Sequence, residues 1–259
     1  MAWMRFNSNT HIRSAGMQVS FDVLYPEHGV GAKGGRTLYL LHDYGENRAE
    51  WLLQGSLPEF VEKYALTVVL PEGLNSFYVN LPSAHFFSDY LCDDLPAYLE
   101  GILPLSSQRE DRFIAGIGMG GYGAFRQVLN RPEVFGGGAS FSGILDIRGF
   151  YGEQASLPCG KQGTTIPAGH LFGTWQELEE NGNDLFLAAR RLAGEKEGVA
   201  FPRLLQVCPD TDPRLEDNRR FHEEASGLVI PVAYEETGKS SRRDYLCGCL
   251  EKCIRFWQA

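Results

Sequence analysis

Several features are missing from this chain of 259 residues. No apolar run approaches the ~18 residues that a membrane-spanning helix needs. Basic residues are in deficit, since 24 Lys and Arg face 33 Asp and Glu and give a net charge of −9. Residues 1–7 lack the basic and then apolar pattern of a secretory signal. These absences exclude a transmembrane helix, argue against nucleic acid or an anionic membrane as partner, and predict a cytoplasmic protein.

Paired metal-ligand motifs are also lacking, although the chain has six cysteines. Cys247, Cys249 and Cys253 gather near the C-terminus, where Cys249 and Cys253 would share one face of a helix. Zinc needs four ligands, and no C-x-x-C or H-x-x-x-H pair supplies the others. We therefore expect free thiols, no metal site and no cofactor.

The composition that remains is that of an ordinary globular protein, with 43% hydrophobic and 22% charged residues. Short apolar, strand-like segments alternate with helix-like ones. The strands are expected at 17–25, 37–41, 66–70, 113–117 and 203–208, and the helices at 47–64, 87–103, 121–130, 184–192 and 217–225. This alternation predicts a doubly wound, mostly parallel sheet with helices on both faces, in one α/β domain over residues 1–259.

The segment at about 150–175 has a different character. It is rich in Gly, Thr and Pro, shows no clear period, and follows a strand-like run at 137–143. An irregular insertion after a sheet strand is typical of a lid over a pocket, and also of a solvated surface loop. Both interpretations remain open at this point.

A glycine-rich turn follows the apolar segment 113–117. Its spacing, Gly116-Ile-Gly-Met-Gly120, matches the G-x-S-x-G nucleophile elbow, in which a strained turn joins a strand to a helix. The position of the nucleophile is Gly118, which has no side chain that could attack a substrate. The same glycines fit G-x-G-x-x-G, but the turn lies mid-chain and Glu133, the nearest acid downstream, sits in a Pro-containing turn. A dinucleotide site is therefore disfavoured.

Motifs along most of the chain resemble those of one enzyme family. They are Leu40-Leu-His42 with Asn47 and Trp51, Met119-Gly-Gly-Tyr-Gly-Ala124, Ser140-Phe-Ser-Gly-Ile-Leu-Asp146, Asn183-Asp-Leu185, and Cys208 to His222. In this order they resemble the esterase D and tributyrin-esterase branch of the α/β-hydrolases, which includes S-formylglutathione hydrolases and, more distantly, mycolyltransferase-like enzymes. The resemblance covers about 17–256 and implies the α/β-hydrolase fold.

The resemblance also implies a degenerate catalytic triad. The family's serine position is Gly118, and its acid position matches Asp212. The family's histidine precedes a D-Y motif, here Asp244-Tyr245, and counting back from this motif places the histidine position on Ser241. No histidine follows His222, so the serine and the histidine are both missing. The retained carboxylate of Asp212 is then free to pair with Arg242 or Arg243.

The oxyanion side of the site departs from the family pattern as well. His42-Asp43 stands where the family has His-Gly, which changes the turn that carries the oxyanion-hole positions, the amides of Tyr44 and Met119. His42, Asp43 and His85 are the further residues that we expect at the pocket.

Loss of the serine or the histidine lowers turnover of such a triad by about 10⁶-fold. We therefore expect a catalytically inactive esterase-family protein, a pseudo-esterase, which binds a small acyl or ester-like ligand. Two alternatives stay open: an active carboxylesterase on short acyl esters with an unrecognised nucleophile, and a structural or assembly subunit. Relatives often form dimers or tetramers, so the resemblance also implies a homo-oligomer.

Overall fold

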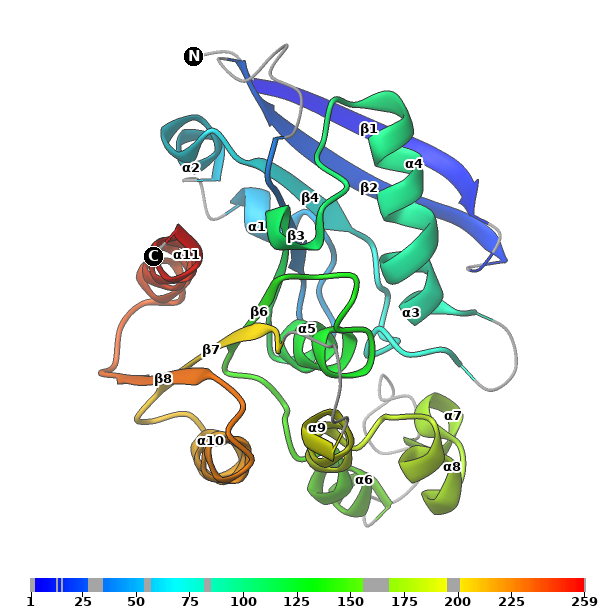
Figure 1. Ribbon diagram of the computed structural model, residues 1–259, viewed down its shortest axis with the longest axis vertical. Helices are drawn as coiled ribbons and strands as arrows, with labels where there is room; N and C mark the ends of the chain where they lie inside the picture. Colours follow the sequence, from blue (N-terminus) through cyan, green and yellow to red (C-terminus); the bar gives the residue numbers. More distant parts are fainter. Residues whose placement is uncertain are drawn as a thin grey trace.

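A computed structural model of the chain describes residues 3–12, 14, 16–27, 35–53, 57–81, 85–155, 168–194 and 201–258. The described strands form one sheet in the order β1-β2-β4-β3-β5-β6-β7-β8 (Figure 1). The strands are β1 (Trp3–Ile12), β2 (Met17–Pro26), β3 (Thr37–Leu41), β4 (Thr67–Pro71), β5 (Arg112–Ile117), β6 (Gly137–Phe141), β7 (Arg203–Pro209) and β8 (Val232–Thr237).

The strands from β4 to β8 in this order are parallel, whereas β1 and β2 run antiparallel to their neighbours. The central strands β3 and β4 are buried along their whole length, which is why both read as short continuous apolar runs. All parallel strands therefore end at the same edge of the sheet, where loops can combine side chains from distant parts of the sequence.

Helices cover both faces of the sheet (Figure 1). One apolar cluster joins the face with Leu38 and Leu40 to α1 (Glu50–Leu53), α2 (Leu57–Tyr64) and α11 (Arg242–Gln258). The cluster on the other face includes Tyr39 and Leu41. The helices that it joins are α3 (Phe87–Asp89), α4 (Leu95–Ile102), α5 (Met119–Asn130), α6 (Ile147–Ala155), α7 (Ala168–Phe172), α8 (Trp175–Glu180), α9 (Leu185–Gly194) and α10 (Leu215–Gly227).

The predicted doubly wound sheet is confirmed, and the differences from the expected elements are local. In place of the single helix expected at 47–64, the structure has the two helices α1 and α2. Pro58 is the second residue of α2, and proline favours the first turn of a helix over its interior. The helix expected at 87–103 contains a π-helical turn, η2 (Tyr90–Asp94), and a short 3₁₀ turn, η3 (Arg109–Asp111), precedes β5.

The segment at about 150–175 is partly helical rather than irregular. Residues 150–155 end α6 and residues 168–172 form α7, whereas 156–167 lie outside the described residues. Its function as a lid stays a prediction.

Among the described residues, no helix combines the length and the apolar character needed to cross a membrane.

Candidate functional site

One cavity lies at the carboxyl edge of the parallel strands, and residues at or after the ends of β3, β5, β6, β7 and β8 line its wall. Its volume is about 520 Å³. Asp43 follows β3, Gly118 follows β5, Ser142 and Ile144 follow β6, and Asp212 follows β7; the other lining residues are Ile117, Pro209, Thr211, Pro213, Arg214, Lys239, Ser240, Arg242 and Tyr245. The structure thus brings together Gly118, Asp212 and Asp43, which the sequence analysis had named separately.

The turn at Gly118 has the backbone form of a nucleophile elbow. Its φ of 54° and ψ of −112° place it in a strained region, directly before the first residue of α5. Gly120 allows the close approach of α5 to the sheet, because a β-carbon there would lie 2.5 Å from the carbonyl oxygen of Leu41. The frame that presents a nucleophile is therefore retained, while the side chain is absent.

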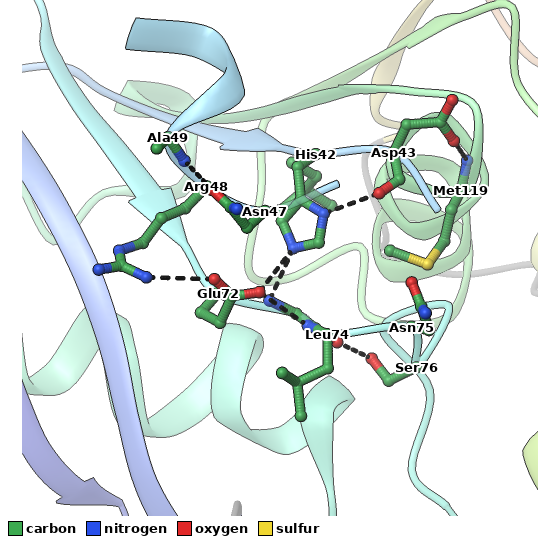
Figure 2. A network of polar contacts seen from close by, with 12 residues as sticks. His42, Asp43, Asn47, Arg48, Ala49, Glu72, Leu74, Asn75, Ser76 and Met119 are labelled. Atoms are coloured by element: carbon green, nitrogen blue, oxygen red, sulfur yellow. Dashed lines mark hydrogen bonds and ion pairs between the residues drawn. The ribbon is translucent and has the colours of Figure 1, made fainter. Parts of the chain in front are cut away.

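The carboxylate of Asp43 occupies the space next to Gly118. Its Oδ1 accepts a hydrogen bond from the backbone N–H of Tyr44 at 2.7 Å. It accepts another from the backbone N–H of Met119 at 2.8 Å (Figure 2). A β-carbon on Gly118 would lie 2.6 Å from Oδ2 and closer still to Oδ1. Burial raises the pKa of this carboxyl, although the two N–H groups oppose the effect. Both the side-chain space of a serine and the two expected oxyanion donors are thus taken up.

His42 lies fully buried beneath this turn and holds its backbone (Figure 2). Its Nδ1 donates to the carbonyl oxygen of Asp43 at 2.8 Å, and its Nε2 lies 3.1 Å from Glu72 Oε1. Arg48 continues this polar network, 3.2 Å from Glu72 and 3.2 Å from the buried carboxylate of Asp22. His42 does not line the cavity; it positions the residue that does.

Asp212 is a further lining residue of the cavity. Its Oδ1 accepts a hydrogen bond from the backbone N–H of Arg214 at 2.8 Å. Among the described residues no ion pair joins Asp212 to Arg242, which instead contacts Glu46 and lies 3.8 Å from Glu50. Pairing with Arg243 stays a prediction. Glu46 lies in the turn after β3 and Glu50 at the start of α1, and both are close to the Arg242 guanidinium.

Ser241, at the position aligned with the histidine, is exposed and is absent from the cavity wall. It begins α11: its Oγ accepts from the backbone N–H of Asp244 at 3.2 Å and donates to Asp244 Oδ2 at 2.7 Å. This is the geometry of a helix N-cap. The spacing Ser241-x-x-Asp244 was a signal for this role in the sequence.

His85 lies at a different cavity, of about 360 Å³, with Leu74, Phe87, His170 and Leu171 among its lining residues. The chain after β4 carries it to the start of α3, next to α7 and away from Gly118. No histidine is found among the described residues that line the Gly118 cavity.

Tyr245 is a residue of the site that sequence reasoning used only to fix the alignment. Its hydroxyl donates to the carbonyl oxygen of Val207 at 2.8 Å and lies 3.0 Å from Ser142 Oγ. Since the Tyr245 proton is given to Val207, Ser142 is the donor in the second bond. Ser142, which follows β6 directly and lines the cavity, has an unusual positive φ of 49°.

Comparison of the sequence with known proteins identifies its family. The model of the family described as "Putative esterase" matches residues 14–201. The chain belongs to this esterase family. An acetyl esterase of Caldicellulosiruptor saccharolyticus is 29% identical over 205 residues, which are 78% of this chain and 75% of the relative. The resemblance in sequence is therefore confirmed at the level of the family.

Solved structures show that this member of the esterase family has the α/β-hydrolase fold. The fluorophosphonate-binding serine hydrolase F (FphF) of Staphylococcus aureus has a TM-score of 0.84 at 22% identity, covering 99% of this chain and 98% of that protein. The S-formylglutathione hydrolase FrmB of the same organism has a TM-score of 0.81 at 22% identity and the same coverage. MPT51 of Mycobacterium tuberculosis has a TM-score of 0.76 at 19% identity, covering 98% and 96%.

Proposed function

We propose that this protein is a non-hydrolytic member of the esterase family, a pseudo-esterase, which uses the cavity at Gly118 to bind a small acyl or ester-like ligand. One observation carries the proposal: the residue at the nucleophile elbow has no side chain. The acid position Asp212 is retained, but no histidine stands between it and the elbow among the described lining residues. Acyl transfer by a triad needs both missing groups.

Ser142, which lines the cavity directly after β6, is one residue that an alternative serine mechanism could use. A serine becomes a nucleophile when a neighbouring base accepts its proton. The acceptor of the Ser142 proton is the hydroxyl of Tyr245, whose pKa burial raises further above its usual range. A protonated phenol is not such a base, which argues against hydrolysis through Ser142.

Cys208, near the carboxyl end of β7, is a candidate thiol at this edge of the sheet. Burial raises its pKa to about 12, and the carboxylate of Asp212 adds to the effect. The thiolate, which is the reactive form, is therefore a minor species at neutral pH. The active-esterase alternative finds no activated nucleophile in either residue.

The wall of the cavity suits a ligand with a short apolar chain and a polar end. Ile117, Ile144, Pro209 and Pro213 provide apolar surface. The polar lining comes from the carboxylates of Asp43 and Asp212, three basic side chains, and the hydroxyls of Ser142, Thr211, Ser240 and Tyr245. A cavity of this size and mixed character is typical of small-molecule sites.

Hydrolysis of p-nitrophenyl acetate by the purified protein tests the proposal, with Asp212→Ala as the matched variant. We expect both proteins to release p-nitrophenol at the rate of buffer alone. A rate well above buffer that falls in Asp212→Ala would overturn the proposal, since the retained acid would then be part of a working site. A rate that persists in Asp212→Ala would overturn it as well and would point to another nucleophile.

A further inference from the structure

The two N–H groups next to the elbow converge on one point in space, which is the arrangement of an oxyanion hole. The N–H of Tyr44 comes from the turn after β3 and that of Met119 from the start of α5, and both meet Asp43 Oδ1, at 2.7 and 2.8 Å. Such donors stabilise a negatively charged oxygen in a site shielded from water. The donor pair is thus intact, and a carboxylate of the chain itself occupies it.

We propose that the Asp43 carboxylate acts as an intramolecular ligand of this oxyanion hole and reverses the polarity of the subsite. A family substrate would place its carbonyl oxygen here, whereas this cavity binds a hydrogen-bond donor of the ligand, such as a primary ammonium group. This inference rests on the proposed function, because it names the polar end of the ligand bound at the same cavity.

The hydrogen bonds of Asp43 explain the reversal. Oδ1 accepts from both N–H groups, whereas Oδ2 has no hydrogen-bond partner among the described residues. Asp43 lines the cavity, so the group offered to a ligand is a carboxylate oxygen, which can only accept. An ester carbonyl would meet this acceptor without a proton between them, whereas an ammonium or hydroxyl group would donate to it.

The turn is built to keep the carboxylate in place. His42 fixes the carbonyl oxygen of Asp43 from below, and Glu72 and Arg48 extend that support into the sheet (Figure 2). Met119 is the first residue of a helix of 12 residues, whose N-terminus favours a negative charge. Gly118 leaves the space that the carboxylate needs, since a β-carbon would collide with it.

The charges around the subsite are compatible with a cationic ligand. Arg242 and His42 act on the Asp43 carboxyl, and Arg242 is itself paired with Glu46 and lies 3.8 Å from Glu50. Arg214 and Lys239 line the same cavity, and the Arg214 guanidinium lies 3.6 Å from the carboxylate of Asp217. Asp212 adds a second carboxylate to the same wall.

A matched pair of probes, n-butylammonium chloride and sodium butyrate, separates the two polarities because their chains are alike and their head groups opposite. Thermal unfolding at constant ionic strength would be followed for wild type, Asp43→Gly and Asp43→Asn. We expect butylammonium to stabilise the wild type and butyrate to have no effect on it. In Asp43→Gly the preference should invert, with butyrate raising Tm by about 3 °C at a tenfold excess over its Kd.

Asp43→Asn is the control for charge. It removes the same negative charge as Asp43→Gly, yet its amide oxygen can still accept from both N–H groups. We expect it to lose the response to butylammonium, because the amide NH2 that takes the place of Oδ2 donates rather than accepts. Its response to butyrate should be weaker than that of Asp43→Gly, in which both N–H groups are left open. Equal responses to butyrate in Asp43→Asn and Asp43→Gly would overturn the inference, as would an Asp43→Gly variant that does not respond.

The amide resonances of Tyr44 and Met119 can be followed in the wild-type protein, so this measurement does not depend on whether a variant folds. In a pH titration followed by NMR, both amide protons should shift together as the Asp43 carboxyl takes up its proton. Independent behaviour of the two amides would contradict a shared carboxylate. Neither ligand binding nor the amide titration measures turnover. Ester hydrolysis by the wild type would therefore refute the proposed function, while the polarity of the subsite would still be decided by the binding and NMR measurements.

Discussion

Asp43 and Gly118 are coupled at the scale of single residues, because the carboxylate of one fills the side-chain space of the other. Gly118→Ser must push the carboxylate away from the Tyr44 and Met119 amides, and we expect a loss of about 2 kcal/mol or more in the free energy of unfolding. With Asp43→Gly present, the serine has room. The double variant should therefore be more stable than the sum of the single effects by about 1–2 kcal/mol.

Urea unfolding of the four proteins measures this coupling. The strain of a serine at φ 54° is present in both variants that carry it and cancels in the cycle. Effects that add to within about 0.5 kcal/mol would contradict the contact between the two positions.

The titration of Asp43 leads to a prediction about pH. Burial raises the pKa of this carboxyl in the folded protein, so the folded state binds its proton more tightly than the unfolded state does. The ionised carboxyl therefore lowers stability as pH rises from the unfolded value, near ~3.9, through the folded pKa. The neutral Asp43→Asn variant does not pay this penalty.

The difference in unfolding free energy, variant minus wild type, should consequently increase with pH over that window and level off above the folded pKa. Each pH unit that separates the two pKa values contributes about 1.4 kcal/mol. Urea unfolding at pH 4, 5, 6 and 7 measures the difference. A difference that decreases as pH rises would show that the pKa is lowered instead.

Residue positions were predictable from the sequence to the extent that a motif fixed them. Gly118 and Asp212 meet at one cavity because both follow strands whose ends coincide. The direction of the Asp43 side chain was not predictable. The replacement of the family's glycine by Asp43 shows that the turn has changed, but it does not indicate which groups the new carboxylate contacts. Ser241 was assigned to the histidine position by counting back from Asp244, and its role as the N-cap of α11 was missed although the spacing Ser241-x-x-Asp244 signals it.

The packing of α5 against the sheet gives the prediction at the scale of elements. In Gly120→Ala the β-carbon would lie 2.5 Å from the carbonyl oxygen of Leu41 and 2.8 Å from that of His42. Backbone cannot yield as a flexible side chain does, so we expect a loss of more than about 2 kcal/mol.

Gly101→Ala in α4 is the matched control, because nothing lies within 4 Å of the added carbon. We expect it to raise the free energy of unfolding by up to about 1 kcal/mol, since alanine has the higher helix propensity. Thermal or urea unfolding of both variants measures the contrast. Equal effects of the two substitutions would mean that α5 does not approach the sheet this closely.

Elements were predictable where one physical signal dominated. The buried strands β3, β4, β5 and β7 read as apolar runs and lie within one residue of their expected bounds. The edge strand β8 was not predicted, because it is partly exposed and contains Glu235 and Glu236. The helices α6 and α7 were missed because Gly-rich and polar residues in this stretch weaken the helical period.

At the scale of the whole molecule, the sheet determines which distant segments meet, and the family relationship explains why they form a cavity. The alternation of strands and helices predicted a parallel sheet, but the order β4-β3-β5 required either the resemblance or the structure. Composition could not reveal that the elbow at the carboxyl edge carries a glycine. The elbow geometry, the carboxylate of Asp212 at the cavity and the hydrogen bonds of Asp43 to the Tyr44 and Met119 amides are the observations on which the proposed pseudo-esterase function rests.

A fluorophosphonate reagent, which forms a covalent bond with the activated serine of a serine hydrolase, tests this central claim most directly. The wild-type protein would be incubated with the reagent beside an active serine esterase and examined by intact mass. We predict that the mass of this protein stays unchanged while the active esterase is labelled completely. A stoichiometric adduct on the wild type, mapped to a serine at the cavity such as Ser142, would contradict the claim.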